Sequence, residues 1–176
     1  MKFWSYPAPQ IPALGAMLAL ALAMPVFTFA PTLARLRYRP GVDSLIGGLL
    51  PQLVHLGAAH LLLNLSGWLI LALLAWQSGK AAAALAALAT SMFAVALGLS
   101  LETVPMAWYV GLSGALYGVF AWLALAYARQ SPRLSSVGIA ICVLLGVKLL
   151  AGLWRALGPG DLMGIPPAPT AHLYGY

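Results

Sequence analysis

Five polar side chains interrupt the apolar stretches of this sequence and belong to types that can do chemistry: His55, His60, Asn64, Ser113 and His172. A serine activated by a histidine is a nucleophile for acyl transfer. Histidine and asparagine side chains can also donate hydrogen bonds to the oxyanion that forms in such a reaction. The residue types therefore indicate a serine hydrolase centre, with Ser113 as nucleophile and His172 as base.

His60 and Asn64 are four residues apart in the run His60-Leu61-Leu62-Leu63-Asn64. On a helix this spacing places both side chains on one face, one turn apart. They could donate to an oxyanion together with the backbone N–H of Ser113. The alternative is a pair of interhelical hydrogen bonds that hold a helix bundle together.

Ser113 lies in the run Gly111-Leu112-Ser113-Gly114, and Gly118 follows. Glycines beside a serine let backbones approach closely and leave the hydroxyl uncovered, as a nucleophile requires. In isolation, however, Gly114 and Gly118 form a small-xxx-small pair that is common in contacts between membrane helices. Packing is the better explanation of this motif taken alone.

The composition indicates that lipid surrounds the helices that carry these residues. Of the 176 residues, 62% are hydrophobic and 7% are charged, whereas a typical globular chain has about 25% charged residues. Apolar stretches of roughly 20 residues, the length needed to cross a bilayer, recur along the chain. We therefore expect an all-α, multi-pass integral membrane protein with one domain over residues 1–176.

The apolar stretches and the turn signals between them divide the chain into six expected helices. Their approximate ranges are residues 11–30, 52–76, 81–100, 112–128, 135–154 and, for a partial sixth, 168–176. The second, fourth and sixth run in the same direction, and His60, Ser113 and His172 all lie in the first halves of these helices. The three side chains should therefore lie at similar depth near one membrane face. Basic residues fall on both sides of the membrane, so charge alone leaves the orientation open.

Other chemistries are not supported by the sequence. The nine basic residues are scattered over short connections, so no stripe could follow a nucleic-acid backbone. No metal or cofactor site is expected. His55 and His60 both fall in the expected second helix, five residues apart, so the His55 side chain points roughly 140° away from His60. The two histidines would then be unable to share a metal ion, and we interpret His55 as structural.

Taken together, these motifs resemble the rhomboid family of intramembrane serine proteases. The family pattern is a His-x-x-x-Asn pair, then Gly-x-Ser-Gly, then Ala-His-x-x-Gly, and it is matched here by His60 with Asn64, by Gly111 to Gly114, and by Ala171-His172 with Gly175. The resemblance covers the second to the sixth helix and implies a six-helix core. The tryptophan–arginine pair that many rhomboids carry in the first loop is absent before His55.

The resemblance implies a catalytic dyad of Ser113 and His172, with Tyr117 stacked against the imidazole and Gly111 and Gly114 supporting the site. The run from Trp108 to Gly114 and the ending Ala-His-Leu-Tyr-Gly are most similar to the rhombosortase subgroup. That subgroup implies a membrane-anchored protein substrate with a C-terminal Gly-Gly-containing anchor, in the bacterial inner membrane. The alternative is a catalytically inactive rhomboid-like chaperone that binds transmembrane segments without cutting them.

The expected sixth helix has only about nine residues before Tyr176, and a membrane helix needs about 20. We therefore expect the natural protein to carry roughly 10 to 15 further apolar residues, rich in Gly or Ala, after Tyr176. On this interpretation the 176-residue form shows little proteolysis, and a longer sixth helix restores it.

Overall fold

The computed structural model describes residues 10–102, 106–129, 136, 140, 143, 147 and 169–175. Within this part the regular elements are helices, and the single isolated β-bridge pairs Tyr38 with Tyr109. The main helices are α1 (Gln10–Phe29), α2 (Ala58–Gln77), α3 (Ala81–Ser100), α4 (Ser113–Ala128) and α6 (Pro169–Gly175). The expected helix over residues 135–154 lies outside the described residues except for four helical positions.

Three of these helices, α1, α2 and α3, have the length and composition of membrane spans. Each contains 20 residues, and their mean hydropathies lie between 1.8 and 2.0. Large apolar side chains such as Ile11, Leu22 and Ile70 point outward and are more than half exposed. Since an apolar outer surface is stable against lipid rather than water, the chain is an integral membrane protein.

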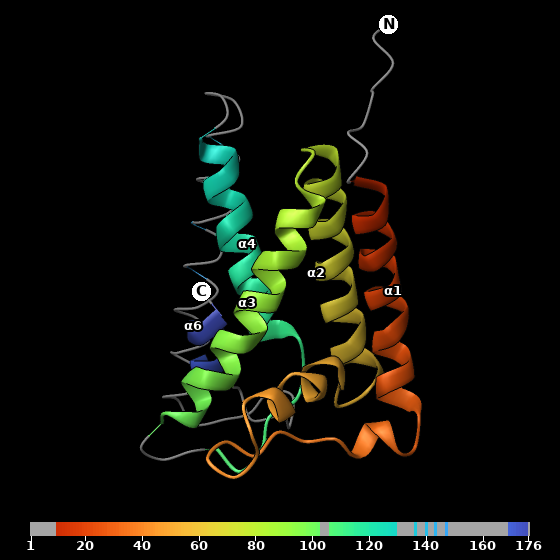
Figure 1. Cartoon of the computed structure of the whole chain (residues 1–176), viewed down its shortest axis with the longest axis vertical. Coiled ribbons are helices and arrows are strands. Elements are labelled where there is room, and N and C mark those ends of the chain that lie inside the picture. The colour runs from red at the N-terminus through yellow and green to blue at the C-terminus, as the bar shows by residue number, and fades with distance from the viewer. Residues whose placement is uncertain are drawn as a thin grey trace, which may run out of the picture.

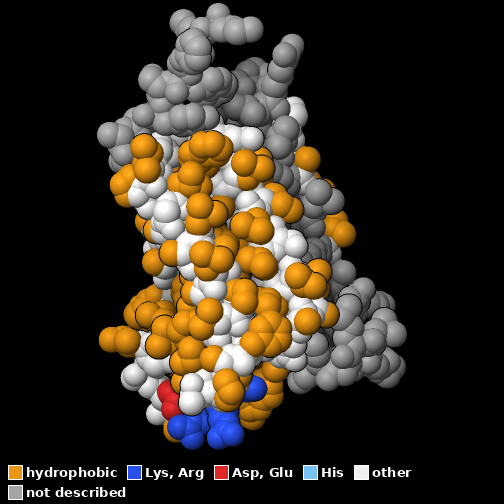
Figure 2. Space-filling view, turned by 90° about the vertical axis from the view of Figure 1, so that its right-hand side faces the viewer, with side chains coloured by type: hydrophobic (Ala, Val, Ile, Leu, Met, Phe, Trp, Pro, Cys, Tyr) orange, Lys and Arg blue, Asp and Glu red, His pale blue; other side chains and the backbone are white. Residues whose placement is uncertain are grey.

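On the face shown in Figure 2, charged side chains lie together at one end of this apolar body. The loop after α1 lies at that end, where it carries Arg35, Arg37, Arg39 and Asp43 (Figure 1). Arg39 forms an ion pair with Asp43, with Nη2 and Oδ1 2.8 Å apart. α2 and α4 begin nearer this end, and α1 and α3 finish near it (Figure 1).

The helices are joined at depth by hydrogen bonds from aromatic side chains. Trp68 on α2 is fully buried, and its indole N–H donates to the Met17 carbonyl of α1 over 3.0 Å. The Tyr127 hydroxyl of α4 donates to the Leu74 carbonyl of α2 over 2.9 Å. A buried aromatic polar group needs such a partner, so each bond fixes the register of two neighbouring helices.

The predicted start of the second helix near residue 52 is wrong, because α2 begins at Ala58. Leu50–Leu53 instead form a 3₁₀ turn, and the Gln52 side chain of that turn donates to the Met92 carbonyl of α3 over 2.8 Å. Gly57 then adopts a φ of 149° immediately before the helix. Apolar residues continue through this segment, so its sequence gives no hydrophobic signal for the break.

α4 is shorter than the spans, with 16 residues. Figure 1 shows the chain rising from the loop end of the molecule before this helix starts. The first residue of α4 therefore lies within the depth of the bundle rather than at its end. This residue is Ser113.

Candidate active site

Ser113 follows a tight backbone turn that only glycine makes easily. Gly111 has a φ of 104°, in the region that residues with a Cβ rarely adopt. A Cβ placed there would also lie 2.7 Å from Cε1 of His60. Gly111 therefore lets the chain turn into α4 and lets the His60 ring lie directly against the backbone two residues before the serine.

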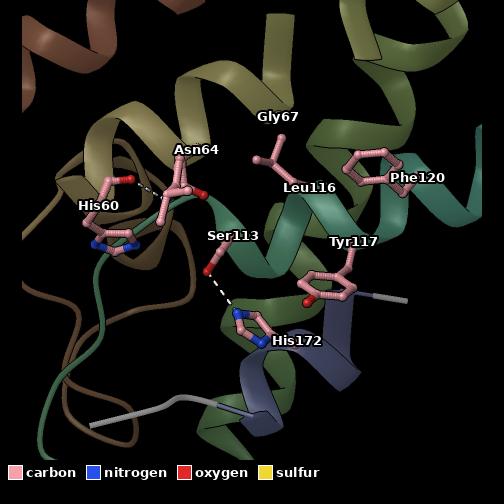
Figure 3. Close-up of a pocket in the computed structure, with 9 residues that line it drawn as sticks. His60, Asn64, Gly67, Ser113, Leu116, Tyr117, Phe120 and His172 are labelled. Atoms are coloured by element: carbon pink, nitrogen blue, oxygen red, sulfur yellow. Dashed lines mark hydrogen bonds between the residues drawn. The ribbon is translucent and has the colours of Figure 1, made fainter. Parts of the chain in front are cut away.

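The structure brings Ser113 and His172 together across α4 and α6, as expected from their matched depth. Ser113 Oγ lies 3.0 Å from His172 Nε2 (Figure 3). This separation falls in the range of about 2.6 to 3.2 Å for a base that takes a proton from a nucleophile. The arrangement can therefore transfer the hydroxyl proton to the imidazole.

The Tyr117 ring stacks on the imidazole of His172, as the family resemblance implies. The ring centroids are 4.7 Å apart and the planes differ by 28°. Tyr117 is buried and lies one helical turn after Ser113 on α4. This contact restricts the imidazole to a plane in which Nε2 faces the serine.

Glycines allow α6 to approach α4 closely enough for this contact. A Cβ at Gly114 would lie 2.7 Å from the Ala171 carbonyl oxygen, and a Cβ at Gly118 would overlap the Gly175 carbonyl oxygen. The small-xxx-small packing considered from the sequence is therefore present. It is also compatible with a catalytic site, because the same close approach carries His172 to Ser113.

Ser113 and His172 share a cavity with the His60 and Asn64 side chains of α2 (Figure 3). Its volume is about 250 Å³, and it is lined by His60, Leu63, Asn64, Gly67, Ser113, Leu116, Tyr117, Phe120 and His172. The prediction that His60 and Asn64 face the same cavity as Ser113 is confirmed. Mostly apolar walls around a few polar groups are typical of a ligand site.

The hydrogen bonds of His60 and Asn64 leave donors for the cavity. The Asn64 amide donates one hydrogen to the His60 carbonyl within α2, over 3.0 Å, and the NH₂ group carries a second. The Leu56 N–H points to Nδ1 of His60 over 3.4 Å. Nδ1 is therefore the acceptor, which places the proton of the neutral ring on Nε2.

The prediction that His55 points away from His60 is wrong. Their rings meet edge to face, with centroids 5.0 Å apart. The 140° separation assumed that both residues lie on one helix, but His55 precedes α2. Nδ1 of His55 lies 3.2 Å from the Thr28 hydroxyl of α1. Among the described residues no group of three potential metal ligands forms, and His55 links the start of α2 to α1.

His55 should make stability depend on pH. Burial, followed by the charge of His60, lowers the pKa of His55 from 6.5 to about 4. The pKa of His55 is lower in the folded state than in the unfolded state, where it is near 6.5. The free energy of unfolding is therefore highest above pH 6.5 and decreases as the pH falls toward 4. This decrease in the free energy of unfolding is about 3 kcal/mol. Between pH 7 and pH 4.5 in detergent, the melting temperature should fall less for His55→Gln than for the wild type. Equal changes would contradict this role of His55.

Sequence reasoning missed one polar group beside the nucleophile. The Tyr109 hydroxyl accepts a hydrogen bond from the Gly114 N–H over 3.4 Å, although Tyr109 precedes α4. No spacing rule could place it there, because its position depends on the bridge to Tyr38, far away in the sequence.

Comparison with known proteins supports the relationship indicated by the motifs. The family model described as the rhomboid domain matches residues 44–176, which is most of the chain and includes both Ser113 and His172. Neither the curated proteins nor the solved structures include a significant match. The match to the family model extends from the loop after α1 to the end of α6, and on this evidence the chain belongs to the rhomboid family.

Proposed function

We propose that this protein is an intramembrane serine endopeptidase in which Ser113 is the nucleophile and His172 is the general base. The observation that carries the proposal is the 3.0 Å contact between Ser113 Oγ and His172 Nε2. It is supported by the shared cavity, which brings the side chains of α2, α4 and α6 to one point within an apolar bundle.

In the proposed reaction His172 takes the proton of Ser113 while Oγ forms a bond to the scissile carbonyl carbon. The protonated imidazole then gives this proton to the leaving amine as the C–N bond breaks. Water subsequently attacks the acyl-enzyme, and His172 accepts and returns a proton in the same way. In this scheme Tyr117 keeps the imidazole in its working orientation by stacking.

The oxyanion of the tetrahedral intermediate would be stabilised by the backbone N–H of Ser113 and by the side chains of His60 and Asn64. Donors in a site that excludes bulk water stabilise such charge strongly. Ser113 is also the first residue of α4, so the positive end of the helix dipole faces the developing charge.

The proposed substrate is a membrane-anchored protein that reaches the cavity from the bilayer. Similarity of the Trp108 to Gly114 run and of the C-terminal motif to rhombosortases favours a C-terminal Gly-Gly-containing anchor as the segment removed. We further propose that residues 1–176 form a single domain of the bacterial inner membrane, with residues 135–154 as the fifth helix of a six-helix core.

The test is reaction of the detergent-solubilised protein with a fluorophosphonate probe. Wild-type protein should be labelled, and Ser113→Ala should not be. This replaces the expectation of little activity from a short sixth helix, because the seven-residue α6 already holds His172 Nε2 3.0 Å from Ser113 Oγ. Ser100→Ala is a matched control, because Ser100 lies at the end of α3 and its hydroxyl bonds the Leu97 carbonyl. Equal labelling of wild type and Ser113→Ala would remove Ser113 as the nucleophile. Absence of labelling in the wild type would favour the inactive, chaperone-like alternative.

Asn64→Ala should lower turnover by about 100- to 1000-fold, the usual effect of losing one oxyanion donor. The melting temperature should change little, because the hydrogen bond that the Asn64 amide donates to the His60 carbonyl lies within α2. Cleavage of a membrane-anchored reporter and thermal melting would be measured together. Full activity with a lowered melting temperature would instead assign Asn64 to holding the bundle together.

A further inference from the structure

α6 carries the proposed base although it is the shortest of the main helices. It has seven residues, Pro169–Gly175, and lies against both α3 and α4 (Figure 1). A catalytic group must be held within about 0.5 Å of its working position. A helix of two turns is not stable by itself in that position, because helices this short depend on packing against their neighbours. Contacts with α3 and α4 must therefore fix the place of His172.

On the α4 side, α6 is fixed by contacts between backbones. Gly114 and Gly118 have no side chains, so the carbonyl oxygens of Ala171 and Gly175 come directly against α4. These contacts set the distance between the two helices. The rotation of α6 about its own axis needs a further contact on another side.

Tyr174 provides that contact on the α3 side. A Cβ at Gly98 would overlap the Tyr174 ring at Cγ and at both Cδ atoms. The ring therefore lies directly over the Gly98 backbone, in a recess that exists because residue 98 has no side chain. Tyr174 and Ala171 also belong to one packed group with buried residues of α3 and of the loops, namely Tyr38, Val95, Ala96, Leu99 and Tyr109.

Tyr174 and His172 point to opposite sides of α6. They are two residues apart, which separates their directions by roughly 200° on an α-helix. His172 Nε2 lies 3.0 Å from Ser113 Oγ of α4, whereas the Tyr174 ring lies against Gly98 of α3. A rotation of α6 that withdraws His172 from Ser113 must therefore also move the Tyr174 ring out of its recess.

We propose that Tyr174 is a positioning residue for the general base. Its ring, lying in the recess at Gly98, fixes the rotation of α6 and so keeps His172 Nε2 within reach of Ser113 Oγ. The inference rests on the proposed function. Tyr174 is not among the described residues that line the cavity, so it acts through His172 and not on the substrate.

Tyr174→Ala tests the proposal, with Phe93→Ala as the matched control. Tyr174→Ala empties the recess, and it should slow fluorophosphonate labelling of Ser113 and lower kcat by about 10-fold, less than the roughly 100-fold that a displacement of about 1 Å costs. KM should stay nearly unchanged. Phe93 is an aromatic residue of α3 whose side chain is 44% exposed, so Phe93→Ala should react at the wild-type rate.

Tyr174→Phe separates the ring from its hydroxyl. The phenylalanine ring fills the same recess, so this variant should be labelled at close to the wild-type rate. If Tyr174→Phe were as slow as Tyr174→Ala, the hydroxyl rather than the ring would position α6, and the inference would be overturned.

Gly98→Ala tests the same contact from α3, and it also covers the case in which Tyr174→Ala does not fold. Alanine is a better helix former than glycine, so α3 should stay helical while the added Cβ displaces the Tyr174 ring. Labelling should slow by about as much as in Tyr174→Ala. The atoms nearest to this Cβ all belong to Tyr174, so the double variant should react no more slowly than Tyr174→Ala alone. Losses that multiply in the double variant would contradict the inference.

The labelling of wild-type protein distinguishes failure of this inference from failure of the proposed function. If wild-type protein is labelled at Ser113 and the folded Tyr174→Ala and Gly98→Ala variants react at the wild-type rate, the inference is wrong and the proposed function stands. If wild-type protein is not labelled at Ser113, the proposed function itself fails.

Discussion

Replacing His172 with alanine is expected to lower peptide cleavage by on the order of 10⁴-fold or more, as does loss of the histidine in other serine proteases. The Ser113 hydroxyl is a weak nucleophile unless a base takes its proton. In this structure the group placed to do so is Nε2 of His172, 3.0 Å from Oγ.

The same argument predicts that Ser113 and His172 act as a unit. Ser113→Ala, His172→Ala and the double variant should have similar residual rates, because either change alone removes the activated nucleophile. Initial rates of reporter cleavage would be compared for the three proteins at equal detergent concentration. Additive losses would show that the two residues act independently and would contradict a dyad.

Gly118→Ala is expected to have the second-largest effect. The added Cβ would overlap the backbone carbonyl oxygen of Gly175 and the Ser91 hydroxyl. A backbone atom cannot turn aside as a flexible side chain can, so α6 must move away from α4. A shift of about 1 Å in a catalytic group can cost about 100-fold in rate, and such overpacking costs about 1 to 3 kcal/mol in stability.

Gly15→Ala is the control for this substitution. Gly15 lies within α1, and a Cβ there would meet nothing within 4 Å. Alanine should keep activity and stabilise the helix by about 0.5 to 1 kcal/mol. Cleavage rate and melting temperature would be measured for both variants. Wild-type activity in Gly118→Ala would show that the close contact between α4 and α6 is not needed to position His172.

The sequence by itself determined the features of this protein that depend on local pattern. The predicted helix over residues 81–100 corresponds to α3, Ala81–Ser100, because a mostly apolar run without charged residues and a preceding Gly-Lys turn signal define its limits. The four-residue spacing of His60 and Asn64 was enough to place both on one face of α2. Similar depth in parallel helices was enough to predict the approach of Ser113 and His172.

The tertiary structure decided the features that depend on contacts between distant segments. His55 lies against His60 because Gln52 ties the preceding turn to α3 and α2 starts only at Ala58. Tyr109 reaches the first turn of α4 because its backbone pairs with Tyr38, 71 positions earlier in the sequence. Periodicity describes one helix at a time. Where an apolar segment stops being helical, and which buried hydroxyl lies beside the nucleophile, depend on hydrogen bonds to residues that no local pattern identifies.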